Sequence, residues 1–229
     1  MVVPTYNEKE NLPILVGKIF DLGLSGLEMV VVDDNSPDGT TAVARELAQK
    51  YPVKVMVRDK KRGLGTAYTT AFKYLLDQPI KPNYIVQMDA DLSHNPAEIP
   101  IFLNKIKNCD VVLGSRYVRG GGVENWSWLR RLISRLSNVY ARWILSLPIH
   151  DLTGGFKCWR SEVLEKIDLD SLSSVGYNFQ IETTYRAYQL GFKISEVPII
   201  FTERKLGSSK FDLGIIVESF IKVLLLRMK

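Results

Sequence analysis

Cysteine and histidine are both scarce in this chain, which has two of each among its 229 residues. Cys109 and Cys158 lie far apart and form no pair with metal-ligand spacing, so we expect neither a disulfide framework nor a zinc site. A catalytic triad based on histidine would have to use His94 or His150, and no serine-hydrolase motif occurs. These absences favour a protein of a reducing cytosol.

Long hydrophobic runs and a signal peptide are missing as well. No stretch of about 18 apolar residues occurs, so the sequence predicts no membrane-spanning helix. The N-terminus opens directly on an apolar strand, without the basic segment, apolar core and cleavage site of a signal peptide. We therefore expect neither secretion nor integral insertion, which leaves peripheral attachment to the cytoplasmic face of a membrane.

Glycine-rich phosphate loops are the third absence. No GxGxxG motif follows the first strand, Gly63-Leu64-Gly65 lacks the third glycine, and GxxxxGK[ST] does not occur. A classical dinucleotide site is therefore not expected. A sugar-nucleotide pyrophosphorylase should carry a glycine-rich basic loop after its first strand, where this chain has Pro4–Glu8.

What the chain does have is material for a large core and a basic excess. Hydrophobic residues make up 46% of the sequence, which disfavours disorder. The net charge is +5, which favours anionic partners such as phosphates, nucleotides or acidic lipids.

Short β-rich runs alternate with amphipathic helical runs in the first half. Strands are predicted at residues 1–3, 29–32, 53–57, 84–88 and 111–114. Helices are predicted at 11–22, 40–50 and 96–107, and from the end of a basic loop at 60–65 to about residue 76. This alternation predicts an α/β fold, with a Rossmann-like, mostly parallel sheet and helices on both faces. Ligands of such sheets bind beyond the carboxyl ends of the strands.

The pattern changes near residue 118, and long helices are predicted at 128–147 and 212–228. The first carries Trp128, Tyr140 and Trp143 together with Arg131, Arg135 and Arg142. Aromatic and apolar residues beside basic ones are typical of amphipathic interfacial helices, although ordinary core packing is the simpler interpretation for most of them. No linker divides the chain, so one domain over residues 1–229 is expected.

Acidic side chains follow two of the predicted strands. Asp89-Ala90-Asp91 comes directly after the strand at 84–88, where hard oxygens suit Mg²⁺ or Mn²⁺ bridging a diphosphate. Asp33-Asp34 follows the strand at 29–32, where a carboxylate can accept hydrogen bonds from a base or ribose. The alternatives are a solvated turn for the first pair and helix capping for the second.

Basic residues form a second set. Arg116 follows the fifth strand, Arg130 begins the long helix, and Arg204 and Lys210 lie in a late loop. Arginine forks suit phosphate oxygens. A surface role is the alternative for any single one of them, whereas several that converge on the acidic rim would form an anion site. Nucleic acid is not expected as a partner, because these residues accompany carboxylates rather than covering one face.

Taken together, the motifs resemble family 2 glycosyltransferases of the GT-A fold, and most of all the polyprenol- or dolichol-phosphate mannose synthases. The residues that carry the resemblance are collinear over nearly the whole chain: Val3–Glu8, Val31–Thr40, Met88–Leu92, Gly114–Tyr117, Glu124–Trp126, Asp151–Lys157, and Arg204 with Gly207–Lys210. The resemblance implies a nucleotide-binding half at about 1–117 and an acceptor- and membrane-facing half at about 118–229.

The resemblance also implies roles for single residues. Pro4, Tyr6, Glu8, Val32 and Asp34 would cradle the guanosine of the donor, with Asp33 nearby, and Ala90 would line the pocket. Asp89 and Asp91 would handle the metal and the diphosphate as catalytic residues. Arg116, Arg130, Ser134, Arg204 and Lys210 would bind phosphates of donor or acceptor, and Arg116 and Arg204 would be catalytic. Ser93 stands where many relatives have glutamine, and it would be a third metal ligand directly or through water.

The implied reaction moves mannose from GDP-mannose to dolichyl or polyprenyl phosphate by a single inverting displacement. A phosphate acceptor carries about −1.5 to −2 charges at pH 7 and needs no base to deprotonate it, which fits a motif set rich in Asp and Arg. Asp151 is more readily an orienting group than a base. Some members of the family add membrane helices, so this chain is expected to adsorb to a membrane surface or to recruit a small membrane-protein subunit.

Two alternatives stay open. One keeps the fold and changes the substrate, to give a polyprenyl-phosphate glucosyltransferase that uses UDP-glucose. The other is a non-catalytic subunit that binds a nucleotide or a membrane.

Overall fold

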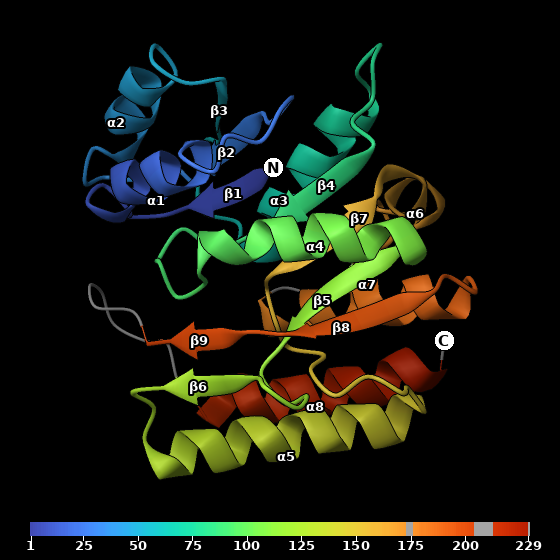
Figure 1. Cartoon of the computed structure of the whole chain (residues 1–229). Helices are drawn as coiled ribbons and strands as arrows, with labels where there is room; N and C mark the ends of the chain where they lie inside the picture. The colour runs from blue at the N-terminus through green and yellow to red at the C-terminus, as the bar shows by residue number, and fades with distance from the viewer. Residues whose placement is uncertain (173–175, 204–212, 229) are drawn as a thin grey trace.

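The computed structural model describes residues 1–172, 176–203 and 213–228 (Figure 1). Its strands are β1 Val2–Thr5, β2 Met29–Asp33, β3 Val53–Val57, β4 Tyr84–Gln87, β5 Val111–Ser115, β6 Gly122–Glu124, β7 Lys157–Arg160, β8 Ile194–Pro198 and β9 Ile200–Thr202. Its helices are α1 Asn11–Phe20, α2 Thr40–Leu47, α3 Leu64–Leu76, α4 Ile99–Lys105, α5 Trp128–Leu145, α6 Ser161–Lys166, α7 Tyr177–Gln189 and α8 Leu213–Met228, with 3₁₀ turns η1 Pro96–Glu98 and η2 Ile106–Asn108 on either side of α4.

Within these residues, seven strands form the main sheet in the order β3-β2-β1-β4-β7-β5-β8. The pairs β1–β2, β2–β3, β1–β4 and β5–β8 are parallel, whereas β7 runs antiparallel to both β4 and β5. The predicted mostly parallel sheet is confirmed. β6 and β9 pair separately in a small parallel sheet beside it.

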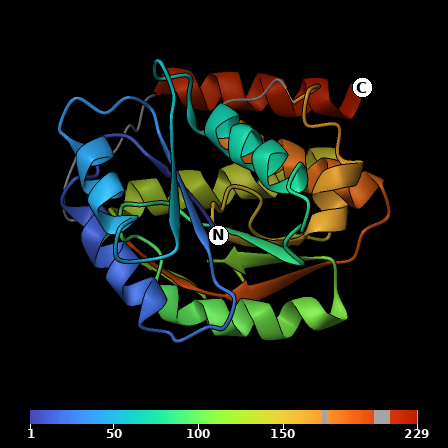
Figure 2. The same cartoon turned by 90° about the horizontal axis from the view of Figure 1, so that it is seen from above.

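Helices cover both faces of the main sheet, as the alternation predicts. Val3 and Val31 point to the face covered by α1, α2 and α4, whereas Val2 and Val30 point to the face covered by α3, α5, α6, α7 and α8. Figure 2 shows the sheet from above, with α4 on one side and α3 and α8 on the other. Because β1 and β2 are buried on both faces, they read as continuous apolar runs.

The predicted element boundaries are close to those observed, and the differences are local. β1 starts and ends later than the strand expected at 1–3. The long helix stops at Leu145 because Ser146 adopts a left-handed conformation, with φ of 54°. The helix expected at 212–228 begins at Leu213 among the described residues. Within the described part of the chain, no helix is both long enough and apolar enough to cross a bilayer.

The outer face of α5 corrects one expectation. Core packing is wrong for Trp128 and Trp143, whose exposed fractions are 74% and 76%. Leu129, Leu132, Leu136 and Val139 are exposed as well. The inner stripe of the helix packs as a core should, through Asn138, Ala141 and Leu145. α5 and α8 lie side by side at the bottom of the molecule in Figure 1, where the Tyr140 and Phe220 rings meet at 4.3 Å.

Candidate active site

Three adjacent strands bring the acidic motifs to one edge of the sheet. β1 lies between β2 and β4, and its Thr5 is level with Asp33 at the end of β2. The segments that leave these strands are 6–8 after β1, 34–38 after β2 and 88–91 after β4. Because all three strands are parallel, their carboxyl ends open at the same edge, where ligands bind in this class of sheet.

Asp33 has a structural task at this edge. Its side chain is fully buried, and its carboxylate accepts hydrogen bonds from the hydroxyls of Thr5, Ser36 and Thr41 at 2.8, 2.6 and 2.5 Å. The Ser36 amide adds a fourth at 2.9 Å. These bonds fix the turn between β2 and α2, so any contact of Asp33 with a donor stays a prediction.

Asp34 is held by an arginine that the motifs do not indicate. Arg58, just after β3, donates through Nε to Asp34 Oδ1 at 2.5 Å. The same guanidinium reaches Thr66 Oγ1 at 2.6 Å and the Gly63 carbonyl at 3.2 Å. Arg58 therefore joins the carboxylate to the loop that begins α3.

The other residues predicted to hold the nucleoside differ in how exposed they are at this edge. The Tyr6 ring is 36% exposed and has Lys61 Nζ above it at 3.6 Å. Glu8 accepts a bond from Asn11 Nδ2 at 2.7 Å. Pro4 is half-buried, whereas Val32 is fully buried, so its side chain belongs to the core.

Asp89 and Asp91 are half-buried at the end of β4. The buried Tyr68 of α3 donates to Asp89 Oδ1 at 3.3 Å, and burial, with the charge of Asp89, raises the Tyr68 pKa well above its usual value. The phenol therefore keeps its proton. A Cβ at Gly155 would lie 3.0 Å from Asp89 Oδ2, so a side chain there would crowd the carboxylate.

The residues that follow Asp89 have surroundings different from those of Asp89. Asp91 Oδ1 accepts from Ser93 Oγ at 2.5 Å and from the Ser93 amide at 3.1 Å. Ala90 is buried in the core beneath α1 and α4 rather than open to the rim. Leu92, the residue after Asp91, has φ of 59°, a left-handed conformation that is uncommon for a residue other than glycine.

Arg116 is paired with a buried carboxylate. Its Nε and Nη2 donate to Oδ2 and Oδ1 of Asp151 at 2.7 Å each, and its amide donates to Oδ2 at 3.0 Å. Burial alone would raise the pKa of Asp151, but the Arg116 charge and these hydrogen bonds outweigh it and lower that pKa. Rings of Tyr117, Trp126 and Phe201 lie 5.4–5.6 Å from the guanidinium carbon.

The loop from Asp151 to Gly155 brings the cationic and acidic parts together. Asp151 holds Arg116 at its start, and Gly155 lies against Asp89 at its end. A Cβ at Gly154, between them, would be 3.0 Å from the Gly114 carbonyl. Asp89, after β4, and Arg116, after β5, therefore both lie against one loop.

Comparison with known protein families decides the class of this arrangement. The sequence matches Glycosyl transferase family 2 over residues 1–168, which is most of the chain. The chain belongs to this family. The family-level resemblance seen in the motifs is thereby confirmed.

Two known relatives match the glycosyltransferase over nearly its whole length. It is 47% identical over 226 residues to polyprenol monophosphomannose synthase of Mycolicibacterium smegmatis, which covers 97% of this chain and 84% of the relative. It is 42% identical over 223 residues to undecaprenyl-phosphate mannosyltransferase of Micrococcus luteus, which covers 97% of this chain and 90% of the relative.

Solved structures confirm the fold. Glucosyl-3-phosphoglycerate synthase from Mycobacterium tuberculosis, in complex with Mn²⁺, uridine diphosphate and glucosyl-3-phosphoglycerate, superposes with a TM-score of 0.72 at 20% identity. The superposition covers 99% of this chain and 78% of that chain. The glycosyltransferase thus has the GT-A type of fold.

The acidic side chains after β4 fit a divalent ion that is bound jointly by protein and phosphate oxygens. No group of three or more His, Cys, Asp and Glu side chains that could hold a metal occurs in the described part of the chain. Mg²⁺ in nucleotide sites is commonly held by one or two carboxylates and completes its shell with phosphate and water oxygens. Asp89 and Asp91 are of the residue type that could supply such a pair, and both as metal ligands, with Ser93 as a third, stay predictions.

The other predicted phosphate ligands have partners of their own. Arg130 pairs with Glu203 at 2.5 Å and lies 4.1 Å from the centre of the Trp126 ring. Ser134 Oγ accepts from the Tyr117 hydroxyl at 2.7 Å. Both residues are on α5, next to the Arg116 site. Arg204 and Lys210 lie outside the described residues, so their roles stay predictions.

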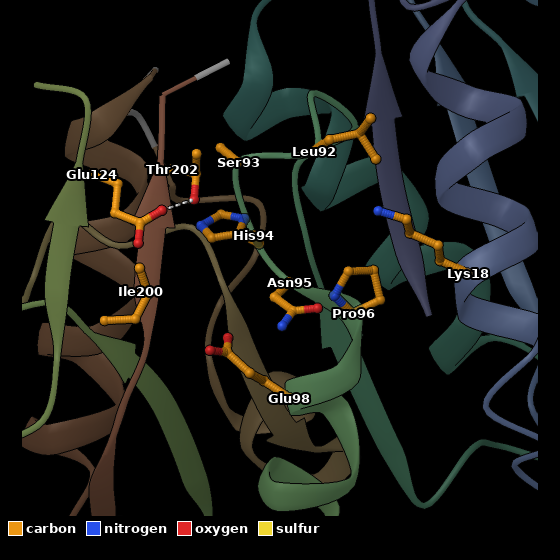
Figure 3. Close-up of a pocket in the computed structure, with 10 residues that line it drawn as sticks. All are labelled: Lys18, Leu92, Ser93, His94, Asn95, Pro96, Glu98, Glu124, Ile200 and Thr202. Carbon is orange, nitrogen blue, oxygen red and sulfur yellow. Dashed lines mark hydrogen bonds between the residues drawn. The ribbon is translucent and has the colours of Figure 1, made fainter. Parts of the chain in front are cut away.

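A polar cavity of about 370 Å³ lies beside the turn after β4 (Figure 3). Its walls come from that turn, η1, α1, β6 and β9, and His94 is near its centre. The His94 ring packs between Phe156 and Phe201, at 5.3 and 5.2 Å. Burial lowers the pKa of His94 to about 4, so the ring is neutral near pH 7 and packs the turn against β9.

Sequence reasoning missed Arg58 and Tyr68. Tyr68 lies in the apolar stripe of α3 and reads as a core residue. Arg58 reads as a surface charge at the end of a strand. Only their contacts in the folded chain identify these two residues, because neither residue spacing nor composition predicts such contacts.

Proposed function

We propose that the chain transfers mannose from GDP-mannose to the phosphate of a polyprenyl or dolichyl phosphate, with inversion at the anomeric carbon. The observation that supports this most directly is the convergence of Asp89 and the Arg116–Asp151 pair on the loop 151–155. The choice of mannose and of a polyprenyl phosphate rests on the names of the two relatives, polyprenol monophosphomannose synthase and undecaprenyl-phosphate mannosyltransferase.

The proposed chemistry needs charge control more than proton transfer. The acceptor phosphate is already a nucleophile near neutral pH, so positioning and desolvation are the main requirements. Arg116, which is buried beside the rings of Tyr117, Trp126 and Phe201, would hold a phosphate group where each charge contact is stronger than in water. A Mg²⁺ or Mn²⁺ ion held by Asp89 and Asp91 would neutralise the leaving diphosphate.

Asp151 serves this scheme as a positioning residue. Its exposed fraction is 1%, and both of its oxygens accept bonds from Arg116. A general base must reach the proton that it removes. Asp151 instead fixes the direction of the guanidinium.

The reaction is tested by donor competition. Purified protein is incubated with Mn²⁺ or Mg²⁺, a polyprenyl phosphate in detergent, and either labelled GDP-mannose or labelled UDP-glucose. We expect lipid-linked mannose from the first donor and no product from the second. Lipid-linked glucose would instead establish the glucosyltransferase. If wild type and Asp91→Ala bind the nucleotide sugar equally and neither forms product, the non-catalytic subunit is correct.

A lipid acceptor also requires a membrane surface, and α5 offers a face suited to one. Its exposed apolar residues include Trp128, Leu132 and Trp143, and the exposed Arg131, Arg135 and Arg142 lie along the same helix. Helices that combine these residue types insert their apolar side into the interface of anionic bilayers. We place the membrane against this face of α5.

Removing the two exposed tryptophans should release the protein from membranes. Trp128→Ser/Trp143→Ser is expected to weaken binding to phosphatidylglycerol vesicles by about tenfold or more, because each indole loses a large apolar burial. Vesicle sedimentation measures the effect. Ile80→Ser is the matched control, since Ile80 is 89% exposed but distant in sequence. Equal binding by the double variant and wild type would contradict this surface, and no binding by wild type to protein-free vesicles would favour a membrane-protein subunit.

A further inference from the structure

Asn138 lies on the inner side of α5 and uses its whole hydrogen-bonding capacity. Its Oδ1 accepts from the amides of Leu152 and Thr153 at 2.7 and 3.3 Å. Its Nδ2 donates to the Ser134 carbonyl at 3.0 Å and to Thr153 Oγ1 at 3.1 Å. A carboxamide has two acceptor positions and two donor hydrogens, so all four are occupied. The two amides facing Oδ1 also fix which end of the carboxamide is oxygen.

Thr153 is the link between Asn138 and Arg116. Its hydroxyl accepts from Asn138 Nδ2 and, at 2.7 Å, from Arg116 Nη2. The same hydroxyl donates to Asp151 Oδ1 at 3.4 Å. One donor and two acceptor positions are all that a hydroxyl has. The Thr153 hydroxyl therefore uses its full capacity in joining Asn138, Arg116 and Asp151.

We propose that Asn138 is a positioning residue that ties the membrane-facing helix to the phosphate-binding arginine. The proposal rests on the proposed function, because it assigns Arg116 to a phosphate group. Asn138 is 2% exposed, and its side chain bonds to Ser134, Leu152 and Thr153 rather than to Arg116 itself. It acts on Arg116 through the loop at 151–153.

The two faces of α5 allow one helix both to contact the membrane and to hold the loop at 151–153. The outer face of α5 exposes Trp128 and Trp143, and its inner face holds the loop through Asn138. A second tie joins Tyr117, next to Arg116, to Ser134 one turn before Asn138. A lipid whose tail lies along the outer face thus has its phosphate presented to an arginine held by the inner face of the same rigid element.

The test separates acceptor handling from donor handling. For Asn138→Leu, which has a similar volume and no hydrogen bonds, we expect KM for polyprenyl phosphate to rise about tenfold, because two buried amides lose their acceptor and the loop shifts. KM for GDP-mannose should stay within about twofold. Titration calorimetry with a short, water-soluble prenyl phosphate should show the same loss without any turnover.

Leu145→Ala is the matched control, since Leu145 is equally buried on α5 but packs in the apolar core. It should lower the unfolding temperature and leave acceptor KM unchanged. Thr153→Val removes only the linking hydroxyl and covers the case in which Asn138→Leu does not fold. Where both variants fold, Thr153→Val and Asn138→Leu also form a double-mutant cycle, in which the combined effect on acceptor KM should fall well short of the sum of the single effects.

The outcomes distinguish this inference from the function on which it rests. If wild type transfers mannose and the Asn138 and Thr153 variants leave acceptor KM and prenyl phosphate binding unchanged, the positioning role is wrong and the function stands. Equal loss with Leu145→Ala would also overturn it, because the effect would then be one of stability. If wild type transfers no sugar and binds no prenyl phosphate, the proposed function fails first.

Discussion

Replacing Asp89 or Asp91 with asparagine is expected to lower kcat/KM for sugar transfer by about a thousandfold or more, since removing one preorganised electrostatic group commonly costs that much. Asparagine keeps the size of the side chain and removes its charge. Size matters most at Asp89, because Gly155 and Tyr68 lie directly against its carboxylate. The leaving diphosphate would then lack its main neutralising partner.

Initial rates over a titration of Mn²⁺ measure this effect. The variants should not regain wild-type rates at saturating metal if the carboxylates also orient the diphosphate. Asp77→Asn is a suitable control, because Asp77 is an exposed carboxylate at the far end of α3 and its loss should leave the rate unchanged. Near-normal turnover of Asp89→Asn and Asp91→Asn would refute the metal and diphosphate role.

The fold could be predicted from the first half of the sequence because its signals are local. β2 has five buried residues, the first four of them apolar, and α3 ends at the predicted Leu76 but begins at Leu64, within the loop predicted at 60–65. β7 was beyond such reasoning. Its four residues, Lys157–Arg160, contain two basic side chains and form a buried antiparallel strand between β4 and β5. Lys157 is buried because its Nζ reaches the Gln180 carbonyl and Thr184, which are distant in sequence.

The site was predictable where a residue follows directly from its strand. Asp89 and Asp91 stand where the sheet rule places ligands, whereas the contacts of the loop 151–155 with Arg116 and Asp89 are tertiary and could not be predicted. Which partner each charge takes could not be predicted. Asp33 and Asp34 are neighbours in sequence, yet one anchors a turn through three hydroxyls and the other pairs with Arg58. The division of the chain near residue 117 stays a prediction.

The outer face of α5 could not be assigned to membrane or protein contact from the sequence. Apolar residues at helical spacing indicate an apolar face, but the spacing does not say whether protein or membrane covers it. Asn138 on the opposite face is the informative residue in hindsight. A polar side chain on the buried face of a helix requires hydrogen-bond partners, and those of Asn138 include the loop that holds Arg116.

Substitutions in the Arg116–Asp151 pair should affect stability and activity differently. Arg116→Met is expected to abolish detectable transfer and to lower the free energy of unfolding by about 3–5 kcal/mol, since it leaves a buried carboxylate without its partner. Arg116→Lys keeps the charge but cannot make the two parallel bonds to Asp151, so it should recover part of the stability and little of the rate.

Arg116→Met/Asp151→Leu separates the two effects. With both charges replaced by apolar groups of similar volume, most of the stability should return, because a buried pair often contributes little beyond such a substitute. Transfer should stay lost, since the phosphate then has no arginine to bind. Urea unfolding and initial rates measure the two quantities on the same preparations, and recovery of transfer in the double variant would exclude Arg116 from phosphate binding.

Acid provides an independent check on the same pair. The pKa of Asp151 is lowered in the folded protein, so the pair stabilises the fold at pH values above the ordinary pKa of an aspartate and loses that contribution as pH falls through the lowered pKa. The Arg116→Met/Asp151→Leu variant has no such contribution to lose. Its unfolding free energy should therefore fall less steeply below pH 4 than that of wild type, and parallel acid profiles for the two proteins would show that Arg116 does not hold Asp151 in its charged form.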